Sequence, residues 1–289
     1  MDDPQLSPAP LVSIITPMFN AEQFISQTIE SVQKQTLTNW EMLIVDDCST
    51  DQSREIVREI CKNDSRICLI ERTKNAGGPA APRNEAMRQA RGKYFAFLDA
   101  DDLWLPEKLE KQTSFMEQDR ELFLSYTMMT TTEQHGDFQQ SSNHYRPLDN
   151  ETIFKQLLLR GNMVPILTVM IKNQNDLGLY FDESPGIVSC EDLDFWLQLA
   201  YAEKKFAFLD ATLSTYRIHN ANISSGMINS IQTNLFLMRK WRSKISLWFA
   251  VKVYALLFWR RGMLLLLRDV IPTSLWQTAR EKLGIIKKI

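Results

Sequence analysis

The sequence predicts an α/β protein with a mainly parallel central sheet flanked by helices. Short apolar, β-branched runs alternate with helix-like segments over roughly ninety residues, and this alternation is typical of parallel sheets. The four runs are residues 11–16, 40–45, 67–71 and 94–98. Because ligands of such sheets bind beyond the carboxyl ends of the strands, the residues that follow each run are candidate site residues.

The first run, residues 11–16, is continuously apolar and predicts a strand buried on both faces, which Pro17 is expected to end. Asn20 is then placed to cap a helix with apolar positions at Phe24, Ile25, Ile29 and Val32. The second run leads through DDCSTD into a helix that carries Ile56, Val57 and Ile60. After the third run, an Ala-rich helix is expected at 83–91.

The second half of the sequence is less regular. Residues 128–150 are polar and predict a surface excursion. Further predictions are a helix at 151–160, a strand at 164–171, a helix at 191–202 and one or two strands at 206–219. The resulting organisation is a lead-in at 1–10, a main domain at 11–226 with halves 11–127 and 128–226, and a helical tail at 227–289.

Charge is distributed unevenly along the 289 residues, whose net charge is −2. From Arg239 onward there are 12 basic and 2 acidic side chains, whereas the preceding residues hold 21 basic and 33 acidic ones. A basic tail on an acidic body favours a polyanionic partner, either nucleic acid or anionic lipid. The four cysteines form no CxxC pair, and residues 1–10 lack the pattern of a signal peptide, so we expect reduced thiols in a cytoplasmic protein.

Five carboxylates follow the predicted strands and should meet at one edge of the sheet: Asp46, Asp47, Asp99, Asp101 and Asp102. Such a rim repels itself unless cations or hydrogen-bond donors lie among the carboxylates. Two interpretations of the sequence DAD, residues 99–101, stay open. The residues cap the next helix, or they bind Mg²⁺ or Mn²⁺, which prefer carboxylate oxygens and can bridge two phosphates.

Other polar residues have two interpretations as well. Asp47 is either capping material or an acceptor for a base or ribose, and Arg83 either faces the acidic rim or forms a surface ion pair. The pair Glu191 and Asp192 is either a helix start or a general base whose pKa is raised by its neighbour and by burial. Three more residues end the last strand and could contact a diphosphate or metal: Tyr216, Arg217 and His219.

Four motifs together resemble family 2 glycosyltransferases with the GT-A fold, a Rossmann-like fold. They are VSIITPMFNAEQFISQTIESVQKQT, EMLIVDDCSTDQS, RNEAMRQARGKYFAFLDADD and CEDLDFWLQL, and the resemblance covers about residues 11–225. It is closest to bacterial enzymes of lipopolysaccharide, teichuronic-acid or capsule synthesis. The resemblance implies an inverting, metal-dependent transfer from a nucleotide-sugar, with a UDP-hexose expected, to a hydroxyl of a lipid-linked or cell-surface glycan.

The resemblance also implies roles for single residues. A first nucleotide-binding loop is formed by Thr16, Pro17, Phe19 and Asn20. Asp47 contacts the base, and Arg83 and Arg217 lie near the nucleotide-sugar. Asp99 and Asp101 form the metal and diphosphate motif, with Asp101 as the direct ligand of Mn²⁺ or Mg²⁺ and His219 beside it. Asp192 is the general base, with Glu191 as its neighbour.

Two departures from the family pattern affect these expectations. The turn NAGGPAAPRN carries two prolines where such enzymes have a Gly-Ala-Ser-rich turn, which leaves the local donor contacts open. No QxxRW motif follows the acidic pair, so we expect the transfer of a single sugar. Two rival functions are a sugar nucleotidyltransferase, which would need a Gly- and Arg-rich loop after the first strand, and a degenerate glycosyltransferase that serves as a membrane-bound assembly factor.

The tail predicts contact with a membrane surface. Its apolar run at 245–259 is broken by Lys252 and is too short to span a bilayer. Four tryptophans among Lys and Arg suit a helix in the headgroup region of an anionic leaflet, so we expect a peripheral protein on the inner face of the cell membrane. The alternative is a helix packed on the main domain or on a partner. Nucleic acid is not expected, because no binding module accompanies the charge.

Overall fold

The computed structural model describes residues 9–133, 138–139, 147–173, 178–219, 236–251 and 253. Two compact units, Met1–Leu237 and Met238–Ile289, divide the chain. The sequence places the end of the main domain at 226, inside a stretch that lies outside the described residues, so this boundary stays a prediction.

One half of the sheet is parallel. Its central strand β1 (Val12–Met18) pairs with β2 (Trp40–Asp46) on one side and with β4 (Tyr94–Phe97) on the other. Strand β3 (Ile67–Glu71) pairs in parallel with β2 and forms the edge. These strands carry apolar side chains on both faces because helices cover both faces of the sheet.

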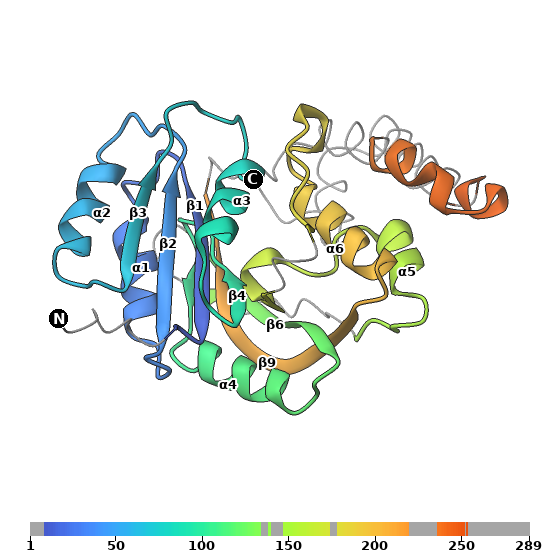
Figure 1. The fold of residues 1–289 in the computed structure, drawn as a ribbon, viewed down its shortest axis with the longest axis horizontal. Helices are drawn as coiled ribbons and strands as arrows, with labels where there is room; N and C mark the ends of the chain where they lie inside the picture. Colours follow the sequence, from blue (N-terminus) through green and yellow to red (C-terminus); the bar gives the residue numbers. More distant parts are fainter. Residues whose placement is uncertain are drawn as a thin grey trace, which may run out of the picture. The chain divides into compact units, whose positions relative to one another are not determined.

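Three helices connect these strands: α1 (Ile25–Gln33), α2 (Ser53–Cys61) and α3 (Ala80–Gln89). The chain steps from β1 to β2 to β3 in one direction, and α3 then returns it to β4 on the other side of β1. Right-handed crossovers therefore put α3 on the face opposite α1 and α2. Figure 1 shows α2 beside β3 and α3 beside β1 and β4. The reversal between β1 and β4 is where ligands of such sheets bind.

The sheet continues beyond β4 with mixed directions, in the order β8, β6, β9, β5. Strands β8 (Met170–Lys172) and β6 (Leu122–Glu133) run antiparallel to each other, and β9 (Lys205–Ile218) runs parallel to β6. The short strand β5 (Leu103–Trp104) pairs with the end of β9, and β7 (Phe138–Gln139) pairs with β6. The end of β9 thus lies beside the turn that follows β4.

Further helices follow β4 along the described part of the chain. They are α4 (Lys108–Glu117), α5 (Ile153–Arg160) and α6 (Glu191–Tyr201), with the 3₁₀ turns η1 (Ile166–Thr168), η3 (Pro185–Ile187) and η5 (Arg242–Lys244). An aromatic cluster of Phe97, Phe181, Phe195 and Trp196 packs the end of β4 against α6, with ring centroids 4.4–6.2 Å apart. This packing brings the start of α6 to the carboxyl edge of the parallel strands.

The structure corrects four expectations about secondary structure. Pro17 does not end the first strand but lies within β1, where its missing N–H costs nothing because pairing with β4 stops at Ile15. Asn20 does not cap α1, whose N-cap residue is Phe24. Residues 128–133 belong to β6 rather than to a surface excursion. Of the expected strand at 164–171, only 170–171 lie in a strand, β8, while 166–168 form the turn η1.

The second unit is described in part. Helical residues 247–251 and 253 present Leu247, Trp248 and Val251 to solvent, with Trp248 84% exposed, while Ala250 and Val253 are buried. The rest of the expected tail lies outside the described residues. Within the described ranges, no helix has the length and hydropathy needed to cross a membrane.

Candidate functional site

The Arg83 side chain forms ion pairs with two carboxylates that are far apart in the sequence. Its Nη2 donates to Asp99 Oδ1 at 2.6 Å and its Nη1 donates to Glu191 Oε1 at 2.9 Å. The Arg83 side chain is 3% exposed and that of Glu191 is 7% exposed. Burial lowers the pKa of Arg83, but Asp99 and Glu191 outweigh burial and raise it above its ordinary value. One buried guanidinium therefore ties the end of β4 to the start of α6.

Asp192 lies next to this ion pair, in the first turn of α6. Its Oδ1 accepts the Leu193 N–H at 2.7 Å and its Oδ2 accepts Nδ2 of Asn162 at 2.5 Å. Burial, followed by the neighbouring Glu191 carboxylate, raises the pKa of Asp192 to about 7, although Arg83 acts in the opposite direction. A carboxylate with this pKa can accept a proton near neutral pH.

Asp101 and His219 form a second cluster. His219 Nε2 lies 2.8 Å from Asp101 Oδ2, and the imidazole stacks on the ring of Phe24 with centroids 4.6 Å apart. The guanidinium of Arg217 lies over the same ring, 4.9 Å from its centroid. Burial, together with Asp99, raises the pKa of Asp101. The Phe24 ring therefore packs against two side chains, that of Arg217 in β9 and that of His219 just after β9.

Asp102, the last of the five carboxylates, is bonded to the end of β9 and is not the N-cap residue of α4, which is Glu107. It is 1% exposed, and its Oδ1 accepts the Arg217 N–H at 2.9 Å. Burial raises the pKa of Asp102 well above its ordinary value, with Asp101 and Asp99 as further causes. Asp102 therefore joins the turn after β4 to the end of β9, which holds His219 near Asp101.

Asp47 binds the loop that follows β3. Its carboxylate oxygens accept the Ala76 N–H at 3.0 and 2.9 Å, and Arg72 Nε lies 3.4 Å from its Oδ1. Burial raises the pKa of Asp47, against the effects of Ala76 and Arg72. The Nδ2 of Asn75 donates to the backbone carbonyl of Asp47 at 2.6 Å. Asp46 is fully buried and accepts the Ser49 N–H.

The residues after β1 lie at the same edge of the sheet. Thr16 is fully buried, and its hydroxyl has no hydrogen-bond partner within the described part of the chain. Phe19 is 53% exposed. Asn20 has a positive φ of 50°, and its Oδ1 accepts the Thr50 N–H at 2.8 Å. Asn20 therefore fixes the loop between β2 and α2 instead of a helix end.

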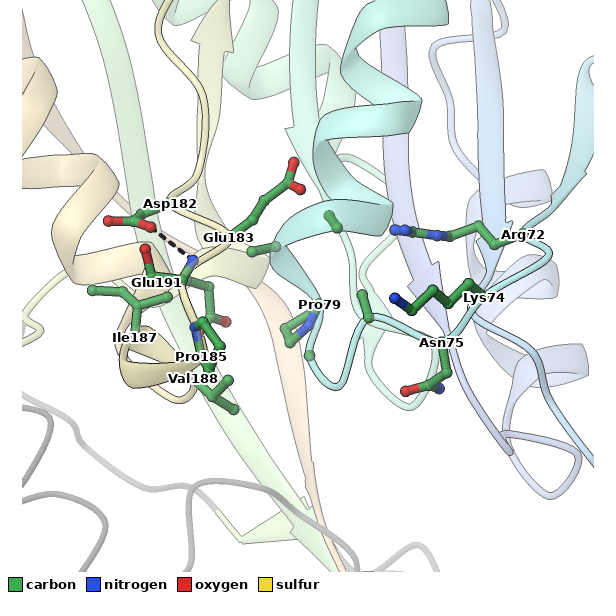
Figure 2. A pocket seen from close by; sticks show the side chains of 15 residues that line it. Arg72, Lys74, Asn75, Pro79, Asp182, Glu183, Pro185, Ile187, Val188 and Glu191 are labelled. Atoms are coloured by element: carbon green, nitrogen blue, oxygen red, sulfur yellow. Dashed lines mark hydrogen bonds between the residues drawn. The ribbon is translucent and has the colours of Figure 1, made fainter.

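A cavity of about 260 Å³ opens between the loop after β3 and the segment before α6. Figure 2 shows Arg72, Lys74 and Asn75 on one side, and Asp182, Glu183 and Glu191 on the other. Pro79, at the start of α3, lies between the two sides. The cavity therefore has a basic wall, an acidic wall and an apolar part, and it touches both the Arg83 pair and the loop bound by Asp47.

The structure divides the predicted site residues into groups. It brings Arg83, Asp99, Glu191 and Asp192 together, and it brings Asp101, Arg217 and His219 together. Asp99 points to Arg83, so it does not join Asp101 and His219 around a common point. Among the described residues there is no group of three His, Cys, Asp or Glu side chains arranged to hold a metal ion. Tyr216 lies in β9 and is paired in register with Thr131.

Several residues were missed by the sequence analysis. Asn84 is 1% exposed, accepts the Phe181 N–H and donates to the Phe181 carbonyl and to Glu183, at 2.8–2.9 Å. It thereby holds the acidic wall of the cavity, and its position next to Arg83 was the available signal. No sequence pattern indicated a role for Phe24 or Asn162 in the site, because their partners lie 30 or more residues away.

Residues 13–173 match the protein family described as Glycosyl transferase family 2. The match covers more than half of the chain. The chain therefore belongs to glycosyl transferase family 2 and is a glycosyltransferase, as the four motifs predicted.

Two curated relatives are similar over most of their length. The chain is 36% identical to TuaG of Bacillus subtilis, a glycosyltransferase named for teichuronic acid biosynthesis, over 80% of this chain and 88% of that protein. It is 35% identical to WfgD of Escherichia coli, named as a UDP-Glc:α-D-GlcNAc-diphosphoundecaprenol β-1,3-glucosyltransferase, over 77% of this chain and 83% of that protein.

Among solved structures, residues 1–349 of S. aureus TarS in complex with UDP-GlcNAc are similar to this fold. The TM-score is 0.61 and the identity 25%, over 76% of this chain and 66% of that one. The chain thus spans about two thirds of that structure. The likeness confirms the expected GT-A sheet with its flanking helices.

Proposed function

We propose that the protein is an inverting glycosyltransferase that moves one sugar from a UDP-hexose to a hydroxyl of a lipid-linked or cell-surface glycan, as in lipopolysaccharide or related polysaccharide synthesis. Asp192 takes the proton of the acceptor hydroxyl, which then attacks the anomeric carbon as the bond to the diphosphate breaks. The observation that carries the proposal is the partly buried Asp192 carboxylate, whose pKa of about 7 suits a general base.

The binding site of the nucleotide-sugar donor is assigned to the carboxyl edge of the parallel strands. The exposed ring of Phe19 offers a stacking surface to a nucleotide, and Thr16, Pro17 and Asn20 are assigned to the same nucleotide-binding loop. Asp47 holds the loop that lines the cavity and is assigned to the base. The complex of TarS with UDP-GlcNAc supports a UDP-sugar as the donor class.

The cation is assigned to Asp101 and His219. A carboxylate oxygen and an imidazole nitrogen 2.8 Å apart fit Mn²⁺, which accepts both donor types, and Mg²⁺ is the alternative. When bound, such an ion supplies Lewis-acid stabilisation of the departing diphosphate. Asp99 is held by Arg83 and assigned to the donor side, and Arg217, stacked on Phe24, is assigned to the diphosphate.

We propose that the acceptor glycan is held at a membrane surface. WfgD is named for a diphosphoundecaprenol acceptor, which supports a lipid-linked acceptor here. Leu247, Trp248 and Val251 form an exposed apolar face next to the basic residues of η5. Such a face can enter the headgroup region of an anionic leaflet, so the protein is assigned to the cytoplasmic side as a peripheral protein.

Transfer assays with a panel of nucleotide-sugars and Mn²⁺ test the proposal. We expect one UDP-hexose to be transferred to a lipid-diphosphate-linked sugar with inversion at the anomeric carbon, and Asp192→Asn to reduce kcat at least about 10³-fold. Undiminished transfer by Asp192→Asn would remove Asp192 from the mechanism. Binding of no nucleotide-sugar at all would favour the assembly factor, and release of diphosphate from a nucleoside triphosphate would favour the nucleotidyltransferase.

Vesicle binding tests the membrane assignment separately. The full chain is expected to sediment with vesicles that contain an anionic phospholipid and to bind neutral vesicles more weakly, because the basic residues add attraction to the buried apolar area. Trp248→Ser should weaken binding, whereas Tyr201→Ser, which removes an exposed ring of the first unit, should not.

A further inference from the structure

We propose that Asn162 is a positioning residue that orients the Asp192 carboxylate and keeps it ionised for proton transfer. This inference rests on the proposed function, in which Asp192 takes the proton of the acceptor. The amide nitrogen Nδ2 of Asn162 donates to Asp192 Oδ2 at 2.5 Å. Asn162 lies outside the four sequence motifs, 30 residues before its partner.

Asn162 is itself held in place. Its Oδ1 accepts the Val164 N–H at 3.1 Å, which fixes the oxygen end of the planar amide. Because oxygen and nitrogen occupy opposite corners of that plane, fixing the oxygen aims the NH₂ group at Asp192. The hydrogen bond to Asp192 therefore comes from a side chain whose orientation is already set by its own loop.

A second hydrogen bond fixes this loop to α6. The indole Nε1 of Trp196 donates to the Val164 carbonyl at 3.0 Å, and Trp196 is fully buried. Asp192 and Trp196 are four residues apart on α6 and so lie on the same side of the helix. Two contacts one helical turn apart, Asp192 with Asn162 and Trp196 with Val164, set the position of the loop along α6.

The backbone before Asn162 also favours this arrangement. Gly161 ends α5 with a positive φ of 84°, a conformation that side-chain-bearing residues rarely adopt. The chain thereby turns out of α5 directly into the loop, and α5 packs against α6. The helix that precedes Asn162 and the helix that carries Asp192 are thus parts of one packed pair.

Three groups besides Asn162 act on the charge of Asp192. Glu191 disfavours the carboxylate form, whereas Arg83 and the Leu193 N–H favour it. A donor to the ionised form lowers a carboxyl pKa, so the Asn162 amide acts against burial and Glu191. Without this amide, a larger fraction of Asp192 would be protonated at neutral pH and unable to accept the proton of the acceptor.

Two substitutions at Asn162 distinguish the hydrogen bond to Asp192 from the hydrogen bond that Asn162 makes within its own loop. Asn162→Ala removes both hydrogen bonds of the side chain. Asn162→Asp keeps an oxygen for the Val164 N–H but replaces the donor by a second carboxylate beside Asp192. Asn150→Ala is the matched control, because Asn150 also makes two side-chain hydrogen bonds, both to the Phe206 backbone and neither to Asp192.

We measure kcat/KM as a function of pH and, separately, the KM for the nucleotide-sugar donor. We expect the acidic limb of the profile to move upward by about 0.5–1 pH unit in Asn162→Ala and further in Asn162→Asp. In both variants, kcat at pH 7 should fall about 5- to 50-fold, whereas the KM for the donor should not change. Asn150→Ala should leave the limb in place.

An unmoved limb in both Asn162 variants would overturn the inference, whether kcat falls or not. The two hypotheses fail in different ways. If Asp192→Asn is inactive and the limb stays in place, the proposed function survives and only the role of Asn162 is lost. If Asp192→Asn is fully active, Asp192 is not the base and both are lost.

Discussion

Arg83 and Glu191 form a buried ion pair across 108 residues of sequence, with Nη1 of Arg83 2.9 Å from Oε1 of Glu191. The same guanidinium holds Asp99, so one cation neutralises carboxylates from both halves of the main domain. This relationship explains how the start of α6, a helix in the second half of the chain, is held at the carboxyl edge of the parallel strands.

Replacing Arg83 by methionine should destabilise the fold strongly. Glu191 would remain buried without its cation, and the loss of one partner of a buried pair costs about 3–5 kcal/mol. Urea-induced unfolding measures this difference. Arg88→Met is the control, because the Arg88 side chain is 54% exposed and lies 3.6 Å from Glu183, so its loss should cost less than about 1 kcal/mol. Equal losses in the two variants would contradict a clamping role for Arg83.

The activity of the wild-type protein should depend on pH through Asp192. Its pKa of about 7 means that the carboxylate is protonated, and unable to act as a base, below neutral pH. We expect kcat/KM to rise as the pH increases from 5 to 8 and to level off above, with a midpoint near 7. A profile that is flat over this range would count against Asp192 as the base.

Asp192→Asn should stabilise the protein in alkaline solution. A pKa raised from 3.8 to about 7 in the folded state means that the folded protein binds the proton more tightly than the unfolded chain. The stability contributed by the protonated carboxyl is complete below about pH 4 and is lost as the pH rises through 7. The variant should therefore gain about 1–3 kcal/mol at pH 8 relative to wild type, and little at pH 4. Urea unfolding at both pH values tests the sign.

Removal of divalent metal should abolish transfer. After treatment with a chelator, we expect activity to return on addition of Mn²⁺, and His219→Ala should raise the Mn²⁺ concentration for half-maximal activity at least about tenfold. Asp64→Asn serves as a control, since Asp64 is paired with Arg66 and is not among the site residues. Full activity of Asp101→Ala in the presence of chelator would exclude the proposed cation site.

Asn84→Ala should disturb the acidic wall of the cavity. The substitution leaves the N–H and carbonyl of Phe181 without their amide partner, which costs about 2–4 kcal/mol for two buried groups. The donor KM should rise as well, because Glu183 loses a hydrogen bond that positions it. Asn63→Ala is the matched control, as Asn63 makes one exposed hydrogen bond on the surface. Substrate-dependent rates and urea unfolding together test this prediction.

Much of the parallel half was predictable, because buried strands require continuous apolar runs and the helices between them require helical spacing. The strand β3 was predicted residue for residue at 67–71. Errors occurred where a tertiary neighbour decided the local structure. Pro17 continues β1 because the neighbouring strand has already ended, and Asn20 binds the backbone of Thr50 instead of a helix end.

By itself, the sequence determined the fold class, the family and the set of carboxylates at the carboxyl edge, since strand periodicity and the four motifs are local patterns. Tertiary structure decided which partner each carboxylate has. Asp99 pairs with Arg83, whereas Asp101 pairs with His219, although the two aspartates are only two residues apart. The physical reason is that adjacent residues in the turn after β4 face different neighbours, which are set by the reversal of strand order beside β1 and by the pairing of β5 with β9.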